Sequence, residues 1–540
     1  MRSIRTDSEL HTLEQRVIHH AKAFGRTLPE MRFFILDSME FMSLLEKGVY
    51  PTSPLNIWEG KRMVNRKHRV ETGQESAIYY EVVQTGNPSY AYLNHTNSPM
   101  MQASVMAHVV GHCEFSELNV LQDSTQDRSE FAMHLVKKVN LARQQMGEVH
   151  YSQYWNACES ILPMIAPHSQ FNLARSIETD SPALQQETDT AVSENHPTPR
   201  LTPFSSTLDS LLHPTNPEEA WQQELQTKLR QETISRKGYK LRAPCQDIFG
   251  FLRAHAPTST AERVVLDYLY TVHSTRDFIL RTQIMNEGWA MYWEKKIMLE
   301  LFKERAVTGI IDYARVFSGV CFPRPYFVRN PYHLGFHLWN HVEELFRDGK
   351  VSLEYVEETD QHVKETWKRE PRKNPIRHME DLIRSVTDYE FLRRFLTPEL
   401  AHELHLNRFH KSEAQRLRIP PDSIIKEEDP WVWVDPKPIK EEMLNFFTHF
   451  GQPRIYVIDT DFQDGGLLLY HRDDGRRLRK DWIKPTLKNL NMLWKGPVYL
   501  ISRNWLYSFS ANLFKETVVT ELRFEKILER VQNSEKPFKM

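Results

Sequence analysis

Three residues of the sequence, His108, His112 and Glu287, have the types and spacing of a metal-binding set. The two histidines are four residues apart, so a helix through them would place both imidazoles on one face, about one turn apart. Glu287 lies in the segment Asn286–Ala290 and would bring a carboxylate from a second helix. Two imidazoles and one carboxylate form a ligand set typical of zinc. We therefore predict that these residues bind a metal ion, with Zn²⁺ as the expected cofactor.

An alternative interpretation is that both histidines are buried in the core and satisfied by hydrogen bonds. The pattern also differs from the H-E-x-x-H signature of zinc peptidases, because Val109 stands where that signature has the glutamate that activates the metal-bound water. Either the metal site is structural, or it acts by other chemistry, for example with another acidic residue as the base. Glu114 and Glu81 are the catalytic candidates, with Glu294 as a further possibility, and the spacing does not choose among them.

His333, His337 and His341 form a second histidine series at intervals of four residues. We favour a solvated or core-lining helix face for this series over a second ligand set. Cys113, next to the first site, is expected to be a buried, inert thiol rather than a nucleophile. The sequence contains no Walker-type loop, no G-x-G-x-x-G and no G-x-S-x-G.

The residues around the candidate ligands have the hydrophobic periodicity of helices. From about residue 100 to 119, apolar residues and both histidines recur at helical spacing, which predicts a helix with the histidines on its buried face. The pattern also predicts a long helix at 260–304 that contains Glu287, and another at 326–346 with Pro331 in its first turn. Further predicted elements are helices at 7–27 and Met31–Glu46 and short strands at Ile78–Val83 and Tyr90–Leu93.

The expected fold class is mainly α with a small α+β domain at the C-terminus. Residues 176–218 are rich in Ser, Thr, Pro, Gln, Asp and Glu and poor in large apolar residues, which predicts a disordered insertion. Near the C-terminus, strand patterns such as Arg454–Asp459 and Val498–Ile501 replace the helical ones. The predicted parts are two helical stretches at 1–175 and 219–415, the insertion at 176–218, a proline-rich linker at 416–440 and the α+β domain at 441–540.

The composition describes a chain that can bury a large core and has little net charge. It has 540 residues, of which 40% are hydrophobic and 26% charged, and its net charge is -2. That charge argues against general nucleic-acid binding. The four cysteines are far apart, no apolar leader follows Met1, and no stretch of about 18 apolar residues occurs. We therefore expect a cytoplasmic protein without a transmembrane segment, and its protein partners are unknown.

The order of these segments resembles the stage V sporulation protein R (SpoVR) family. The segments that carry the resemblance are Ala107–Phe115, Met285–Ala290 and Asn330–Phe336. Similar segments also occur upstream and near the C-terminus, at Ile78–Val83, Asn87–Leu93, Thr486–Lys488 and Leu493–Trp494. The resemblance covers about 30–175, 220–350 and 440–520. Departures from the family pattern occur at Ser116, at Asn56–Gly60 and at the 176–218 stretch.

The resemblance implies a bacterial, cytoplasmic protein that acts in sporulation, through spore cortex formation, or in cell-envelope and peptidoglycan assembly. It brings no settled enzymatic activity. Glu287–Ala290 after a two-histidine helix is also similar to zinc peptidases of the gluzincin type, in which the late glutamate is the third ligand, so the helical core is expected to resemble that scaffold. The alternatives are a zinc-dependent peptidase or amidase of this type, and a non-catalytic scaffold or interaction protein.

Overall fold

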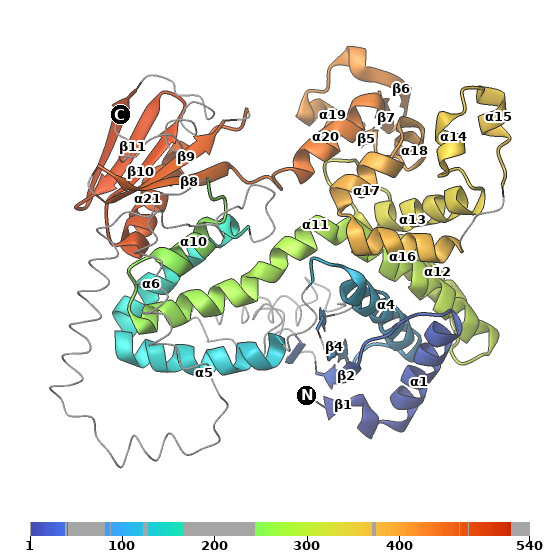
Figure 1. Cartoon of the computed structure of the whole chain (residues 1–540). Coiled ribbons are helices and arrows are strands. Elements are labelled where there is room, and N and C mark those ends of the chain that lie inside the picture. Colours follow the sequence, from blue (N-terminus) through green and yellow to red (C-terminus); the bar gives the residue numbers. More distant parts are fainter. Residues whose placement is uncertain are drawn as a thin grey trace. The chain divides into compact units, whose positions relative to one another are not determined.

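The computed structural model describes residues 2–37, 40–41, 82–86, 88–122, 128–166, 244–369, 374–463, 465–473 and 475–519 (Figure 1). The chain divides into two compact units. Unit 1 consists of Met1–Lys137 and Phe278–Gly451, and unit 2 of Lys138–Asp277 and Gln452–Met540. Each unit is therefore built from two stretches that are distant in the sequence. The predicted insertion at 176–218 and the candidate base Glu81 lie outside the described residues.

A four-stranded sheet in unit 1 has the order β1-β2-β4-β3, with β2 and β4 parallel. Its strands are β1 (Arg2–Ser3), β2 (Met31–Leu36), β3 (Val82–Gln84) and β4 (Ser89–Asn94). The strand predicted at Tyr90–Leu93 is confirmed by β4. The helix predicted from Met31 is wrong over its first six residues, which form β2. Buried Met31 and Phe33 flank exposed Arg32, and this alternation with a period of two is typical of a strand. The helix was predicted because the large apolar residues of this segment also fit a helical spacing.

The rest of unit 1 is mostly helical, and most of its helices share one hydrophobic core. Two of its helices, α1 (Ser8–Ala23) and α4 (Pro99–Leu118), pack against each other. The long α11 (Thr260–Lys303), which agrees with the helix predicted at 260–304, contributes its second part to this unit. The other helices are α12 (Ile310–Val320), α13 (Pro331–Arg347), α14 (Leu353–Glu357), α15 (Gln361–Glu365), α16 (Pro375–Ser385), α17 (Asp388–Phe395), α18 (Pro398–Glu403), α19 (Lys411–Leu417) and α20 (Lys437–Phe447).

The structure differs from the predicted linker at 416–440. A three-stranded sheet of order β5-β7-β6 occupies this part of the chain. Its strands are β5 (Arg408–His410), β6 (Ile424–Glu428) and β7 (Trp431–Val434). Val432 and Val434 of β7 are buried against Phe409, and α20 follows and packs against α17 and α18. The prolines that suggested a linker lie between strands and in the first turn of α20, where the missing N–H is tolerated.

Unit 2 contains the predicted C-terminal sheet, with the strand order β12-β11-β10-β9-β8. Its strands are β8 (Arg454–Phe462), β9 (Gly466–Arg472), β10 (Val498–Ser502), β11 (Trp505–Ser510) and β12 (Leu513–Val518). Strands β9 and β10 are parallel and are connected by α21 (Lys480–Trp494), which buries one apolar face. The backbone of Cys245 pairs with Val457 of β8, and α6 (Glu148–Ser160) contacts α21. The C-terminal sheet therefore shares a unit with residues 138–277.

Unit 2 also contains α10 (Ile248–His255), the second part of α5 (Arg128–Met146) and the first part of α11. The observed fold is thus mainly helical with a small sheet-containing region at the C-terminus, as the predicted fold class states. In the part of the chain that the structure describes, no helix is both long and apolar enough to span a membrane.

Candidate metal centre

Helix α4 carries His108 and His112 and is buried over most of its length. The hydroxyl of Ser98 caps its N-terminus, and Pro99 occupies the first turn. Every residue from 102 to 116 is buried, so neighbours cover this helix on all sides, which explains its apolar sequence. The two histidines are 4% and 5% exposed, and their ring centroids are 4.7 Å apart. The prediction that both lie on a buried helix is confirmed.

Glycines allow α4, α11 and α13 to approach one another closely. A Cβ on Gly111 would lie 2.5 Å from the Cα of Ala290, and a Cβ on Gly288 would lie 2.2 Å from the carbonyl carbon of Gly335. Carbon atoms are normally in contact at about 3.5–4.0 Å. A larger residue therefore fits at neither position unless the helices separate. Because Gly111 is next to the second histidine and Gly288 is next to Glu287, these contacts set the distance between the candidate ligands.

Glu287 extends from α11 toward both imidazoles. Its Oε2 atom lies 3.4 Å from Nε2 of His112 and 3.7 Å from Nε2 of His108. One ligand atom from each of the three residues lies within 4.8 Å of the other two. Burial alone would raise the pKa of Glu287, but the positive charge of protonated imidazoles beside it outweighs burial and lowers this pKa to about 2. The carboxylate is thus ionised when a positive charge lies next to it, and its Oε2 makes no hydrogen bond to any described residue.

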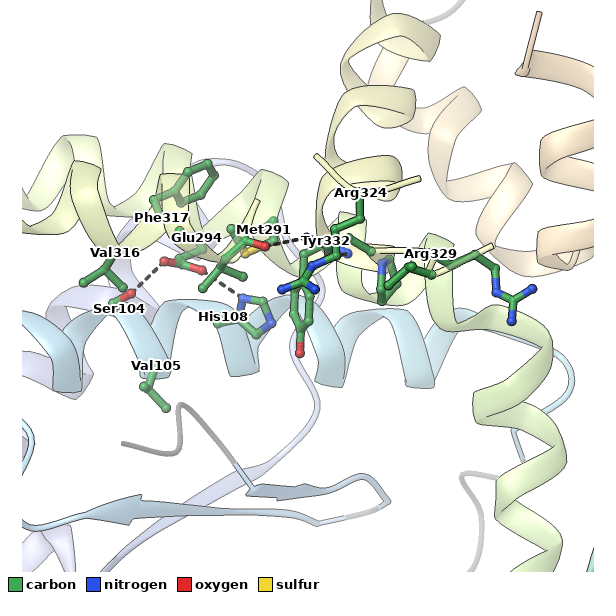
Figure 2. Close-up of a pocket in the computed structure, with 15 residues that line it drawn as sticks. Ser104, Val105, His108, Met291, Glu294, Val316, Phe317, Arg324, Arg329 and Tyr332 are labelled. Atoms are coloured by element: carbon green, nitrogen blue, oxygen red, sulfur yellow. Dashed lines mark hydrogen bonds and ion pairs between the residues drawn. The ribbon is translucent and has the colours of Figure 1, made fainter. Parts of the chain in front are cut away.

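Hydrogen bonds on the far side of each imidazole determine which ring nitrogen faces the carboxylate. Nδ1 of His108 lies 2.8 Å from Oε2 of Glu294, whose Oε1 accepts a hydrogen bond of 2.6 Å from the Ser104 hydroxyl (Figure 2). Nδ1 of His112 lies 2.9 Å from Oδ1 of Asn286. Because these oxygens accept, each Nδ1 donates a proton, and in the neutral imidazoles both Nε2 atoms present a lone pair to the carboxylate.

This arrangement fits a divalent cation. Two imidazole lone pairs and a carboxylate oxygen converge in the buried interior. Because these electron-rich atoms are removed from water, the arrangement is unfavourable unless a positive charge lies between them. Two ligands that are each about 2.0–2.1 Å from a tetrahedral zinc ion lie about 3.3 Å apart, close to the measured 3.4 and 3.7 Å. A carboxylate or amide partner on the far nitrogen is the usual support of a histidine ligand. The structure thus brings the three predicted ligands together, and their donor set fits Zn²⁺.

Comparisons with known proteins relate the chain to one family. The profile of the family described as SpoVR like protein matches residues 5–445. The chain belongs to the SpoVR family. An uncharacterized protein of Escherichia coli (strain K12), YcgB, is 23% identical over 473 residues, which cover 84% of each chain. The family match ends before 486–494, so the C-terminal segments that resemble the family lie outside it.

No solved structure matches this SpoVR chain. The expected likeness of its helical core to gluzincin peptidases therefore finds no support among solved structures, and it rests on the short Glu287–Ala290 segment alone.

Glu114, one of the two candidate bases, belongs to a second buried cluster. Its carboxylate accepts hydrogen bonds from the Arg26 guanidinium at 3.2 Å, the Thr27 backbone N–H at 3.2 Å and the Trp289 indole at 3.0 Å. Burial raises the pKa of Glu114 despite the opposing charge of Arg26. This cluster links α4, α11 and the segment after α1, and Glu114 is not among the three residues that converge at the candidate metal position. The other candidate, Glu81, lies outside the described residues.

The second histidine series begins with His333, which is a structural residue of α13. It is 6% exposed, and its ring nitrogens lie 2.9 and 3.1 Å from the backbone carbonyl oxygens of Cys321 and Leu404. Burial lowers the pKa of His333, and it lowers the pKa of His337 to about 4. These contacts hold the first turn of α13 against its neighbours, in agreement with the core-lining interpretation.

Sequence reasoning missed the residues that support the ligands. Asn286 contacts His112, and the only feature of the sequence that indicated this contact is that Asn286 precedes Glu287. Asp388 is fully buried and accepts hydrogen bonds from the backbone N–H groups of Ile284 and Met285 at 2.8 and 2.9 Å. It therefore fixes the turn of α11 just before Glu287. Because Asp388 lies far along the chain, no local pattern indicated this role.

A cavity of about 470 Å³ lies beside the candidate ligands. His108 and Glu294 form part of its wall, together with Tyr332, whose ring centroid is 6.1 Å from that of His108 (Figure 2). The rest of the lining comes from α4, α11, α12 and the segment that leads into α13. One candidate ligand therefore borders a space large enough for a small substrate.

Proposed function

We propose that this SpoVR protein is a zinc-dependent hydrolase that cleaves a peptide or amide bond. The main support is the convergence of two imidazole nitrogens and a carboxylate oxygen at zinc-like distances, with His108 also in the wall of a cavity. Structural zinc sites have four protein ligands, whereas catalytic sites have three and keep one position open. Among the described residues, three candidate ligands lie beside a cavity, which favours the catalytic kind. Bound zinc would act as a Lewis acid and lower the pKa of a water molecule.

The roles of the surrounding residues follow from their hydrogen bonds. Glu294 accepts the proton of Nδ1 of His108, and Asn286 does the same for His112, so both residues orient the ligands. Val109 leaves α4 without the usual base. Because the oxygens of Glu114 are already hydrogen-bonded, we propose a positioning role for it and keep Glu81 as the candidate base.

Metal content is the first test of this proposal. The full chain is loaded with zinc, dialysed and analysed for metal, alongside His108→Ala and Glu287→Ala. His341→Ala, a half-buried histidine of α13, is the matched control. We expect one equivalent of zinc in the wild type and in the control, and an affinity lower by roughly tenfold or more in the two ligand variants. A wild type that holds no zinc, or a folded His108→Ala that holds it as tightly, would refute the proposal.

Hydrolysis is tested next on the zinc-loaded protein with a mixture of peptides and amides. We expect a chelator to stop cleavage without unfolding the chain, and added zinc to restore it. If chelation only unfolds the protein and no cleavage is found, the ion is structural. The interpretation of the protein as a non-catalytic scaffold then gains support.

We also propose a cytoplasmic role in spore cortex formation or cell-envelope assembly, supported by the family description SpoVR like protein. The four cysteines, all among the described residues, form no disulfide, which agrees with a reducing compartment. The test is deletion of the gene and complementation with the wild type or with His108→Ala. Rescue by the wild type alone would connect this role with the metal centre, and full rescue by the variant would separate the two.

A further inference from the structure

The cavity beside the candidate ligands combines an apolar wall with a basic rim. Four side chains of α11 and α12 supply apolar surface, namely Met291, Val316, Phe317 and Val320. Arg324 and Arg329, from the segment between α12 and α13, line the same cavity; the Arg324 side chain lies beside Tyr332, whereas the Arg329 side chain points away from it (Figure 2). The carboxylate of the lining, Glu294, already contacts the Ser104 hydroxyl and an imidazole through its two oxygens. The positive charge of the arginines is therefore not neutralised by this carboxylate.

Neither arginine forms an ion pair with a carboxylate in the described part of the chain. The guanidinium of Arg329 lies over the ring of Phe446, 3.4 Å from its centroid, and burial lowers the pKa of Arg329. Arg329 also has a φ of +48°, a left-handed conformation that is uncommon for residues other than glycine. Such conformations persist only where the surroundings enforce them, and they cluster at functional sites. The fold thus holds a partly buried cation at the cavity without a protein anion beside it.

Asn330 fixes the segment that carries both arginines. Its side-chain amide donates hydrogen bonds of 2.7 and 2.9 Å to the carbonyl oxygens of Val320 and Phe322, and its Oδ1 accepts one of 3.2 Å from the N–H of Tyr332. Asn330 thereby caps α13, so the positive end of this helix lies at the cavity with Pro331 and Tyr332 in the lining. The arginines and the helix end place positive charge on the same side of an otherwise apolar space.

We propose that this cavity binds a substrate with a free carboxylate next to an apolar side chain, that Arg324 binds the carboxylate, and that Arg329 adds positive charge at the rim. Such a group occurs at the C-terminal residue of a peptide and in an N-acylated apolar amino acid. Guanidinium groups bind carboxylates through paired hydrogen bonds, and the apolar wall takes the side chain. This inference deepens the proposed function. Cleavage of the substrate at a metal ion held by His108 rests on the proposed function, whereas binding of the carboxylate by the cavity requires no metal.

The test measures binding of N-acetyl-phenylalanine and of its neutral amide to the full chain by calorimetry, with and without zinc. The variants are Arg324→Gln and Arg329→Gln. Arg315→Gln, at an exposed arginine of α12 outside the cavity lining, is the matched control. We expect the wild type to prefer the acid over the amide by about tenfold or more, the energy of a charged hydrogen bond. Arg324→Gln should lose this preference, Arg329→Gln should weaken it, and the control should keep it.

Three results would overturn the inference. They are equal binding of acid and amide by the wild type, tighter binding of inorganic phosphate than of the acid, and the same loss in Arg315→Gln as in the cavity variants. Arg324 is exposed, so its variant remains informative if loss of the Phe446 contact unfolds Arg329→Gln. If the wild type holds no zinc but prefers the acid, the proposed function fails and the inference stands. If it holds zinc and shows no preference, the inference fails alone.

Discussion

Replacement of Gly111 by alanine tests whether the close approach of α4 and α11 sets the metal centre. The added Cβ would lie 2.5 Å from the Cα of Ala290 and 3.1 Å from its backbone nitrogen. Carbon atoms need about 3.5 Å, so the helices must separate by roughly 1 Å at this point. The obstacle is backbone, so no side chain can rotate to make room. The strain must therefore be relieved by movement of the helix that carries the histidines.

We expect two measurable effects of this change. Overpacking of a well-filled core lowers the free energy of unfolding by about 1–3 kcal/mol. Separation of the helices also lengthens the distance from Oε2 of Glu287 to Nε2 of His112, now 3.4 Å. Ligand distances in zinc sites tolerate changes of only about 0.2 Å. A displacement several times larger should reduce zinc affinity by about 10- to 100-fold, the range seen when the support of a ligand is lost.

The assay combines competition with a chelator of known zinc affinity and unfolding in denaturant. Gly319→Ala is the stability control, because Gly319 lies in α12 and an added Cβ there has nothing within 4 Å. Its free energy of unfolding should stay the same or rise by up to about 1 kcal/mol. If Gly111→Ala loses stability but keeps the wild-type zinc affinity, the helix spacing does not define the site and the reasoning is refuted.

Three further variants test the residues around the site. Glu294→Gln removes the charge that holds the proton on Nδ1 of His108, so zinc affinity should fall by about 10- to 100-fold in the same competition assay, and an unchanged affinity would argue against this support. Burial raises the pKa of Asp388 to about 8, above the value of about 4 in an unfolded chain. The stability that protonated Asp388 contributes is therefore complete below about pH 4 and is lost as the pH rises through 8. When unfolding in denaturant is measured at pH 4 and at pH 8, the free energy of unfolding should fall less for Asp388→Asn than for the wild type. Arg26→Ala leaves Glu114 buried without its cation, which should lower the free energy of unfolding by about 3–5 kcal/mol. Adding Glu114→Gln should recover part of that loss, and strictly additive losses would contradict the pairing.

The sequence was sufficient for the local features of the fold and the candidate site. His108 and His112 could be assigned to one buried helix face because the periodicity that indicates a helix also gives the direction of its side chains. The long helix around Glu287 and strands β8 and β10 of the C-terminal sheet had equally clear patterns, whereas β11 was not predicted. Each of these predictions depends on residues within a few turns of one another, where spacing in the sequence determines spacing in the structure.

Predictions that depended on distant residues were less successful. The segment after Met31 forms a strand because β4, which comes more than fifty residues later, pairs with it in parallel. The proline-rich 416–440 stretch folds because Val432 and Val434 meet the buried Phe409. Asp388 supports α11 from a position far along the chain. In each case the partner that decides the structure is not visible in the local pattern.

The segment Asn286–Ala290 shows that the positions of the three candidate ligands depend on the residues next to them. Asn286 orients the second histidine, Glu287 faces both imidazoles, and Gly288 allows the close contact with α13. Trp289 donates to the buried carboxylate of α4, and Ala290 lies directly against Gly111. Five successive residues of α11 thus contact α4 and α13, so the geometry of the site depends on how these three helices cross. Under the proposed function, the same two histidines and glutamate on helices without these small-residue contacts should therefore have a lower zinc affinity than the arrangement in this chain.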